Sequence, residues 1–171
     1  KSKRSSEKLI ELRQELEDEI GYCSQTLYTI EVAEDKDILN EIKEEIFSET
    51  VKDKKNFIDK IEKREIQGFT VFVGKNNKQN DFIISKLAKD NDMWFHSHNC
   101  AGSHVLLKLP NGEEPNDELI FECAKLAKLN SQGANSSKVG IIYTRRKNLR
   151  KPPAANLGYV TYKNEQEIVL D

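Results

Sequence analysis

The stretch Asp92–Lys108, with the sequence DMWFHSHNCAGSHVLLK, contains the chain's only Met, its only Trp and all three of its His residues. Its first part, Met93–Ser97, is strand-like, and its last part, His104–Lys108, is a second strand-like run. Between them, Ala101–Ser103 includes a Gly and favours a turn. The stretch therefore predicts a pair of β-strands, and the rest of the chain is expected to support or extend that pair.

The polar side chains of this stretch allow more than one interpretation. Side chains alternate along paired strands, which places His96, His104 and Lys108 together with Trp94 nearby. The three histidines and Cys100 also suit a metal site or a metal- or histidine-dependent nucleic-acid hydrolase. Their spacing matches no familiar zinc arrangement, and no orienting acid or oxyanion donor can be named. We therefore favour a binding or structural role, with no catalytic residue, metal or cofactor.

The composition places the chain in a broad class. Its 171 residues are 33% charged and 37% hydrophobic, enough for one domain of ordinary size and an appendage. No apolar run reaches the length of a membrane span, and the three Cys contain no CxxC pair. These features predict a soluble, cytoplasmic protein without a membrane partner. Because the only Met is at position 93, Lys1 is not a natural start, and we expect an upstream segment in a longer protein.

Residues 1–66 are predicted to be helical, forming one strand of an antiparallel coiled coil and a connecting helix. Gly21 weakens this helix and marks an expected bend or break, and Asp35 or Asp37 is the expected cap of the next helix. An apolar seam of this kind needs a partner, either the missing upstream arm or a second copy of the chain. A scaffold that acts through this arm is therefore a further alternative. The seam recurs at spacings of three and four residues, at Leu9, Leu12, Leu16, Ile20, Cys23, Leu27 and Ile30.

Residues 67–171 are predicted to form an α+β domain with a mostly antiparallel sheet and two packed helices. The expected elements are a strand at 69–73, a turn at 74–77, a short helix from about Asn80 capped by Asn80 or Asp81, the two strands of the opening stretch, a helix after Asn116, a strand at 139–143, and final strands near 158–162 and 167–170.

The charge of the chain is divided unevenly. Residues 1–67 carry 13 Lys/Arg and 18 Asp/Glu, whereas residues 68–171 carry 14 and 11. Between Lys138 and Lys163 there are seven basic residues and no acidic one. The run Tyr143–Lys151, YTRRKNLRK, interleaves its cations with Asn and Tyr, which suits contacts to phosphates. This asymmetry indicates a surface that faces nucleic acid on the C-terminal half.

Three separated segments together resemble a known family. VGKNNKQND (Val73–Asp81), DMWFHSHNCAGSHVLLK and RRKNLRKPPAANLGYVTY (Arg145–Tyr162) resemble, in this order, the NFACT-R domain of the RqcH/NEMF proteins, some of which are called fibronectin-binding protein A-like. The chain departs from the family pattern at Ala101, where Pro is usual, and at Pro153–Ala155, where Gly often follows Lys-Pro. The resemblance covers roughly residues 68–171, and residues 1–66 resemble the returning arm of the family's coiled coil.

The resemblance implies a role in ribosome-associated quality control. Members of this family bind the large ribosomal subunit, including its rRNA, when it carries an obstructed nascent chain. They also recruit tRNA, alanyl-tRNA in bacteria, so that a C-terminal tail is added to the stalled chain. In this family the domain serves as an RNA-binding module, and the reaction belongs to the ribosome. We therefore expect this chain not to be an enzyme.

The expected RNA-binding residues come from all three segments. They are Lys75, Asn76, Asn77, Asn80, Trp94, His96, Ser103, His104, Lys108, Arg145, Arg146, Lys147, Arg150 and Lys151.

Overall fold

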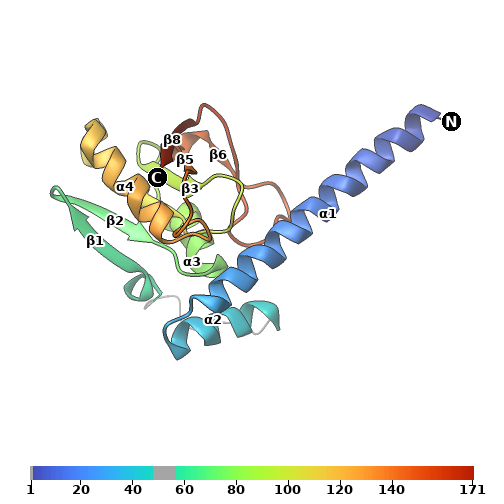
Figure 1. The fold of residues 1–171 in the computed structure, drawn as a ribbon, viewed down its shortest axis with the longest axis horizontal. Helices are drawn as coiled ribbons and strands as arrows, with labels where there is room; N and C mark the ends of the chain where they lie inside the picture. The colour runs from blue at the N-terminus through green and yellow to red at the C-terminus, as the bar shows by residue number, and fades with distance from the viewer. Residues whose placement is uncertain (1, 48–56) are drawn as a thin grey trace.

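The computed structural model describes residues 2–47 and 57–171. A long helix, α1, projects from an α+β body, with the shorter helix α2 beside its base, and the N-terminus lies at the far end of α1 (Figure 1). The expected α+β class with a mostly antiparallel sheet is confirmed. Within the described residues, no helix has the length and apolarity needed to cross a membrane.

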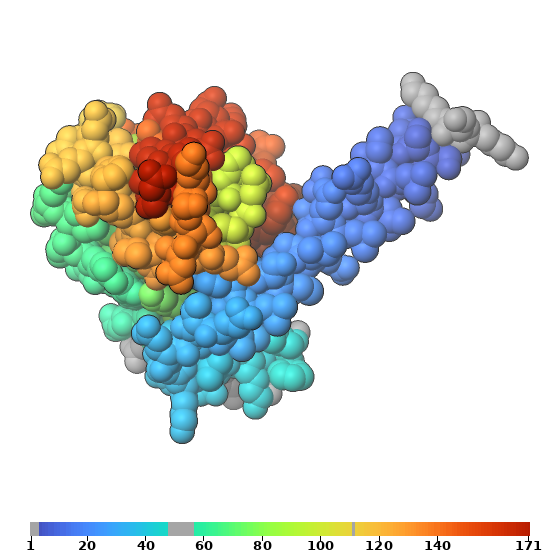
Figure 2. Space-filling model, in the orientation of Figure 1, coloured from blue at the N-terminus to red at the C-terminus, as the bar shows by residue number. Residues whose placement is uncertain are grey.

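The arm begins with two helices, α1 (Ser2–Glu31) and α2 (Lys36–Ile46). The expected cap at Asp35 is confirmed, since its carboxylate accepts a hydrogen bond from Ile38 N at 2.9 Å. The expected bend or break at Gly21 is wrong, because α1 continues through it without interruption. Figure 2 shows the C-terminal part of α1 and α2 against the body, while the N-terminal end of α1 stands clear of it.

One antiparallel sheet forms the centre of the body. Its strand order is β1-β2-β4-β3-β5-β8, and every neighbouring pair is antiparallel. The two strands of the opening stretch pair as predicted, with Trp94 opposite Leu106. The strands are β1 (Glu62–Ile66), β2 (Phe69–Val73), β3 (Met93–Ser97), β4 (Val105–Leu107), β5 (Val139–Arg145) and β8 (Gln166–Leu170), and a separate ribbon pairs β6 (Leu149–Arg150) with β7 (Thr161–Tyr162).

The helical interpretation of residues 1–66 is wrong at its end, where Glu62–Ile66 is strand β1. The reason lies in the turn that follows. Gln67 and Gly68 both have positive φ, 51° and 82°, and they join β1 to β2 with Ile66 opposite Phe69. Two consecutive residues at positive φ are what a tight hairpin turn requires, and this turn pairs β1 with the sheet. Residues 48–56 of the same expected helical region lie outside the described residues.

Two helices pack beside the sheet. The helix α4 (Asp117–Leu129) begins where predicted, with Asn116 accepting a hydrogen bond from Leu119 N at 2.8 Å. The helix α3 (Asn77–Phe82) begins earlier than predicted, because Asn76 rather than Asn80 or Asp81 caps it, accepting from Gln79 N. The remaining short helical turns are η1 (Ile58–Lys60), η2 (Ile83–Leu87), η3 (Pro110–Gly112) and η4 (Arg146–Asn148).

The alternation of β3 and β4 divides the core between two faces of the sheet. Phe95 packs with α4 in one cluster, whereas Trp94 packs with Leu106 and Ile142 in the other, together with η2 and β6. Both Trp94 and Phe95 are almost completely buried. His96 therefore extends from a strand that is paired on both sides, and His104 directly precedes the neighbouring strand β4.

Candidate nucleic-acid interface

The predicted meeting of Trp94, His96 and His104 is observed. The ring centroids of Trp94 and His104 lie 5.4 Å apart, and those of His96 and His104 lie 5.2 Å apart, both edge to face. The Trp94 and His96 rings are parallel, with their centroids 5.8 Å apart. Tyr162, from β7, adds a fourth ring at 5.8 Å from Trp94. The four rings form one aromatic cluster on the face of the sheet opposite α4.

Burial favours the neutral form of both clustered histidines. Burial lowers the pKa of His96, although the backbone carbonyls of Ser97 and Gly102 oppose the change. Burial and the neighbouring His96 lower the pKa of His104 well below its usual value. Since the Ser97 carbonyl can only accept, the His96 Nδ1 at 2.7 Å from it is the protonated nitrogen. Neutral imidazoles are poor partners for phosphate but can pair with an uncharged polar group.

Two polar atoms of the aromatic cluster lack a hydrogen-bond partner among the described residues. They are Trp94 Nε1 and His104 Nδ1, in side chains that are 1% and 4% exposed. Buried polar atoms usually have partners, because an unsatisfied donor or acceptor costs free energy. This exception marks the cluster as a site with unused hydrogen-bonding capacity.

Lys108 does not join this cluster, contrary to the predicted grouping. Its ammonium contacts the buried carboxylate of Asp92 and donates to Leu87 O at 2.8 Å. Asp92 also accepts from Leu109 N at 2.9 Å and from Lys89 N at 2.7 Å. The register explains the result, because Trp94 pairs with Leu106, so that Lys108 lies near Asp92, beyond the far end of β3 from His96. Lys108 is a structural cation within the fold.

The asparagines of the VGKNNKQND segment are buried and face the arm. Asn76 Nδ2 donates to Glu41 of α2 at 2.8 Å. Asn77 Nδ2 donates to Thr26 Oγ1 at 3.1 Å and to Glu45 at 3.0 Å. These amides therefore connect α3 to both helices of the arm, and their described contacts are with the protein itself.

The other expected residues of the first two segments also have partners within the fold. Asn80 Oδ1 accepts from His104 N at 3.0 Å, which links α3 to the strand pair. Lys75 forms an ion pair with Glu62 at 2.7 Å and donates to Asn130. Ser103 is buried, and its backbone N donates to Asn130 O.

The basic run separates into paired and unpaired cations. Arg145 contacts Glu114 and Asn91 O, Arg146 donates to Ile84 O at 2.9 Å, and Lys151 forms an ion pair with Asp81. Lys147 and Arg150 are exposed, and their side chains have no ion pair or hydrogen bond with any described residue. Among the expected cations, these two are therefore the ones available to phosphate.

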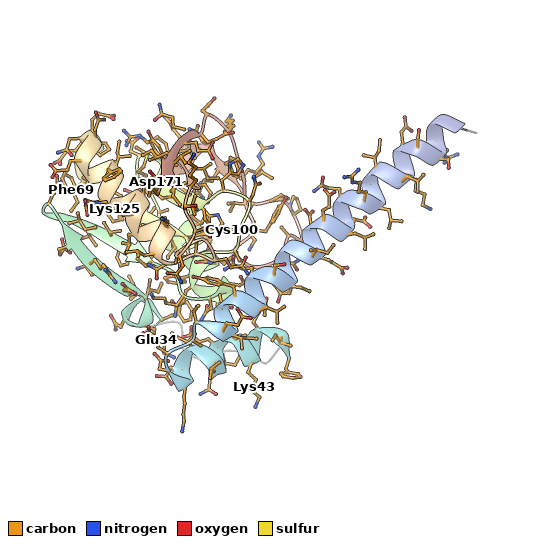
Figure 3. All side chains as sticks on the ribbon, viewed as in Figure 1. Glu34, Lys43, Phe69, Cys100, Lys125 and Asp171 are labelled. Atoms are coloured by element: carbon orange, nitrogen blue, oxygen red, sulfur yellow. The ribbon has the colours of Figure 1, made fainter. Side chains whose placement is uncertain are left out.

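A cleft of about 520 Å³ lies between α1 and the aromatic cluster. Its walls are Asp18, Tyr22 and Gln25 on one side and the four clustered rings on the other, with the Asn156–Tyr159 loop beside them. In Figure 3, the labelled Cys100, which also lines the cleft, lies on the side of the body that faces α1. Gln25 closes one end, since it donates to Gly102 O and accepts from Gly102 N.

The third histidine, His98, lies away from the aromatic cluster. His98 Nδ1 lies 2.7 Å from Glu167 on β8, so it does not converge with His96 and His104. Within residues 2–47 and 57–171, no group of three His, Cys, Asp or Glu side chains is arranged to hold a metal ion. The geometry of the described residues gives the metal-dependent alternative no support.

A protein-family model matches most of the chain. The model of the NFACT protein RNA binding domain matches residues 56–164. The chain belongs to this family. The match begins before β1, which agrees with the place of that strand in the sheet of the NFACT RNA-binding domain.

Similarity to individual proteins and to a solved structure supports the same family assignment. The chain is 32% identical over 174 residues to the Rqc2 homolog RqcH of Bacillus subtilis, covering 96% of this chain and 29% of that protein. It is 32% identical over 106 residues to mouse coiled-coil domain-containing protein 25, covering 60% of this chain and 50% of the relative. Among solved structures, the C-terminal part of the fibronectin/fibrinogen-binding protein of Streptococcus suis matches with a TM-score of 0.85 and 27% identity, over 98% of this chain and 70% of that one.

Several residues of the domain and of the arm were not predicted as part of the site. Tyr159 and Tyr162 line the cleft, and the two aromatic residues of the GYVTY sequence were a signal that could have indicated them. Glu41 and Gln25 position the arm, but nothing in a Glu-rich helical sequence distinguishes a buried Glu from its exposed neighbours.

Proposed function

We propose that this chain is a non-catalytic RNA-binding module with a helical arm, part of a ribosome-associated quality-control factor. The longer protein binds obstructed large ribosomal subunits and tRNA, alanyl-tRNA in bacteria, and promotes C-terminal alanine tailing of stalled chains. The single observation that carries the RNA-binding role is the pair of unpartnered exposed cations, Lys147 and Arg150, on an NFACT RNA-binding domain. The relatives named RqcH support the assignment to a quality-control factor.

Electrostatics favours phosphate at these two residues. Arg145, Arg146 and Lys151 already contact protein acceptors, so RNA would have to displace those contacts to use their charges. Lys147 and Arg150 have no such competition, and each phosphate that a cation neutralises releases counterions. Affinity for RNA should therefore depend on salt chiefly through this pair.

A salt titration tests the proposal. RNA binding is measured for the unmodified chain and for the variants Lys147→Ala and Arg150→Ala over a range of salt concentrations. Each substitution should weaken binding and lower the slope of log affinity against log salt by about 1. Lys125→Ala is the matched control, since its ammonium on α4 is exposed but already paired with Glu122, and its removal should leave the slope unchanged. Affinities that respond neither to salt nor to the two substitutions contradict the proposal.

The arm supports a second role for the same chain, in protein interaction. The seam residues Leu9, Leu12, Leu16 and Ile20 are at least half exposed, and the described chain has no helix against them. We propose that the upstream arm of the longer protein, or a second copy, covers this seam. The division between arm and RNA-binding domain then lies before β1 rather than after residue 66, since Glu62–Ile66 is part of the sheet.

A further inference from the structure

We propose that the cleft between α1 and the aromatic cluster binds an unstacked nucleobase of a single-stranded RNA, with the adjoining phosphates held on the β6–β7 ribbon. The inference rests on the proposed RNA-binding function and deepens it, because it assigns base contact to a part of the molecule distinct from the exposed cations.

The first argument is unused hydrogen-bonding capacity. Trp94 and His104 line the cleft, and Trp94 Nε1 and His104 Nδ1 have no partner among the described residues. An indole N–H can only donate, so a ligand that satisfies it must present an acceptor. Ring nitrogens and carbonyl oxygens on the edges of nucleobases are such acceptors, and single-stranded RNA exposes them.

The second argument is the aromatic wall. Tyr159 and Tyr162 are 36% and 38% exposed at the cleft, unlike Trp94 behind them. Unstacked bases stack on aromatic and imidazole rings of this kind. The cleft volume of about 520 Å³ lies within the range of about 300–1,000 Å³ that is usual for small-ligand sites.

The third argument is charge, which excludes phosphate from the cleft itself. Glu17 and Asp18 of α1 line one wall, and burial together with Asp18 raises the pKa of the Tyr159 hydroxyl. Glu17 is paired with Arg13 at 2.8 Å, which leaves Asp18 as the wall's unneutralised carboxylate. An uncharged heteroaromatic group with an exocyclic amine suits this wall, since Asp18 can accept from the amine, whereas a phosphate meets repulsion.

The fourth argument is continuity with the cations. In the ribbon, Leu149 pairs with Tyr162 and Arg150 pairs with Thr161. Strand alternation directs Tyr162 and Leu149 toward Trp94 and Arg150 to the other face. The backbone of Arg150 thus follows directly on that of Leu149, the partner of Tyr162, and the phosphates that flank the base would cross the edge of the ribbon to reach its unpartnered guanidinium.

The test compares RNA with and without bases. The full chain is titrated with a single-stranded RNA oligonucleotide and with an abasic ribose-phosphate oligomer of the same length and charge. Trp94 is the only tryptophan, so its fluorescence reports directly on the cleft. We expect intact RNA to change this fluorescence and to bind at least about tenfold more tightly than the abasic oligomer, as one stacked base implies. The abasic oligomer should bind through phosphates alone and leave the fluorescence unchanged.

Variants localise the effect. Tyr162→Ala should reduce the affinity for intact RNA to nearly that for the abasic oligomer, with no further loss for the abasic oligomer. Phe121→Ala is the matched control, because Phe121 is 41% exposed on α4 and does not line the cleft. Thermal unfolding of both variants by circular dichroism verifies that they fold.

The outcomes separate this inference from the proposed function. If intact and abasic oligomers bind equally and Trp94 does not respond, the base site is wrong while phosphate binding stands. If neither oligomer binds, the proposed RNA-binding function fails and the base site fails with it. A nucleoside monophosphate that alone reproduces the Trp94 response and competes with RNA identifies a free nucleotide as the source of the base, and overturns the assignment to an RNA strand.

Discussion

The environment of His96 and His104 lowers the pKa of both side chains. His96 and His104 lie 5.2 Å between ring centroids, and burial is the main cause of the lowered pKa of each. A His whose folded pKa lies below its unfolded pKa binds fewer protons in the folded state. Above the unfolded pKa of about 6.5, the histidine is neutral in both states and its contribution to stability is complete. As the pH falls below that value, the unfolded state takes up a proton that the folded state does not, and the contribution is lost.

The lowered pKa of both histidines predicts how the free energy of unfolding changes with pH. The free energy of unfolding should decrease as the pH is lowered from about 7.5 to about 5.5, by as much as about 1.4 kcal/mol per pH unit for each proton taken up on unfolding. Urea unfolding across this range measures it. His104→Asn should flatten the profile whatever its effect at neutral pH. A profile of unchanged slope in that variant would contradict a neutral buried His104.

Two glycines differ in what a methyl group would meet, and they form a matched pair. At Gly74, an added Cβ would lie 2.1 Å from Asn80 Oδ1, the atom that accepts from His104 N. At Gly21, no atom lies within 4 Å. Gly74→Ala should lower the free energy of unfolding by about 1–3 kcal/mol, whereas Gly21→Ala should raise it by about 0.5–1 kcal/mol. Chemical denaturation of both variants tests the contrast, and equal effects would refute it.

At the scale of elements, the junction between arm and body depends on a small set of hydrogen bonds. Gln25 of α1 both donates to and accepts from the backbone of Gly102, and Asn77 of α3 donates to both helices of the arm. A side-chain hydrogen bond contributes about 0.5–1.5 kcal/mol, so the set is individually weak and collectively important.

Removing one member should loosen the junction selectively. Gln25→Ala should increase amide hydrogen exchange in α2 and in the C-terminal part of α1 while leaving β3 and β5 unchanged. Gln14→Ala is the control, because Gln14 is the same residue type on the exposed part of α1, bonded only to Asp18 one turn away. If the two variants exchange alike, the Gly102 contact does not hold the arm.

The elements also show what the sequence could and could not predict. Helices and strands with clear caps or alternation, such as α4 after Asn116 and β5, were predicted correctly from local signals. The β1 strand was missed because EKREI carries a helical composition, and its strand state is set by the positive-φ turn after it and by pairing with β2. At the site, the meeting of Trp94, His96 and His104 followed from strand alternation, whereas the contribution of Tyr162 did not. The inward-facing roles of Asn76 and Asn77 did not, because they depend on helices distant in sequence.

At the scale of the whole molecule, the exposed seam of α1 predicts association. The isolated chain should form dimers at high concentration through Leu12 and Leu16, as amphipathic helices with an uncovered apolar stripe do. Sedimentation measurements should show that Leu16→Glu shifts this equilibrium toward monomer while RNA affinity is retained. Leu129→Glu is the control, since Leu129 is 66% exposed on α4, outside the seam. A chain that stays monomeric at every concentration argues for the upstream arm as the partner.

The projecting helix also has a mechanical consequence. Its 30 residues span about 45 Å, and hydrogen bonds that hold it to the body lie near its C-terminal end, at Gln25 and Thr26. Because the helix is held near one end only, a small force at its free end exerts a large torque on the contacts at the other end. The base is also a wall of the aromatic cleft. A force applied at the distant tip would therefore act first on the side chains that form this wall of the cleft.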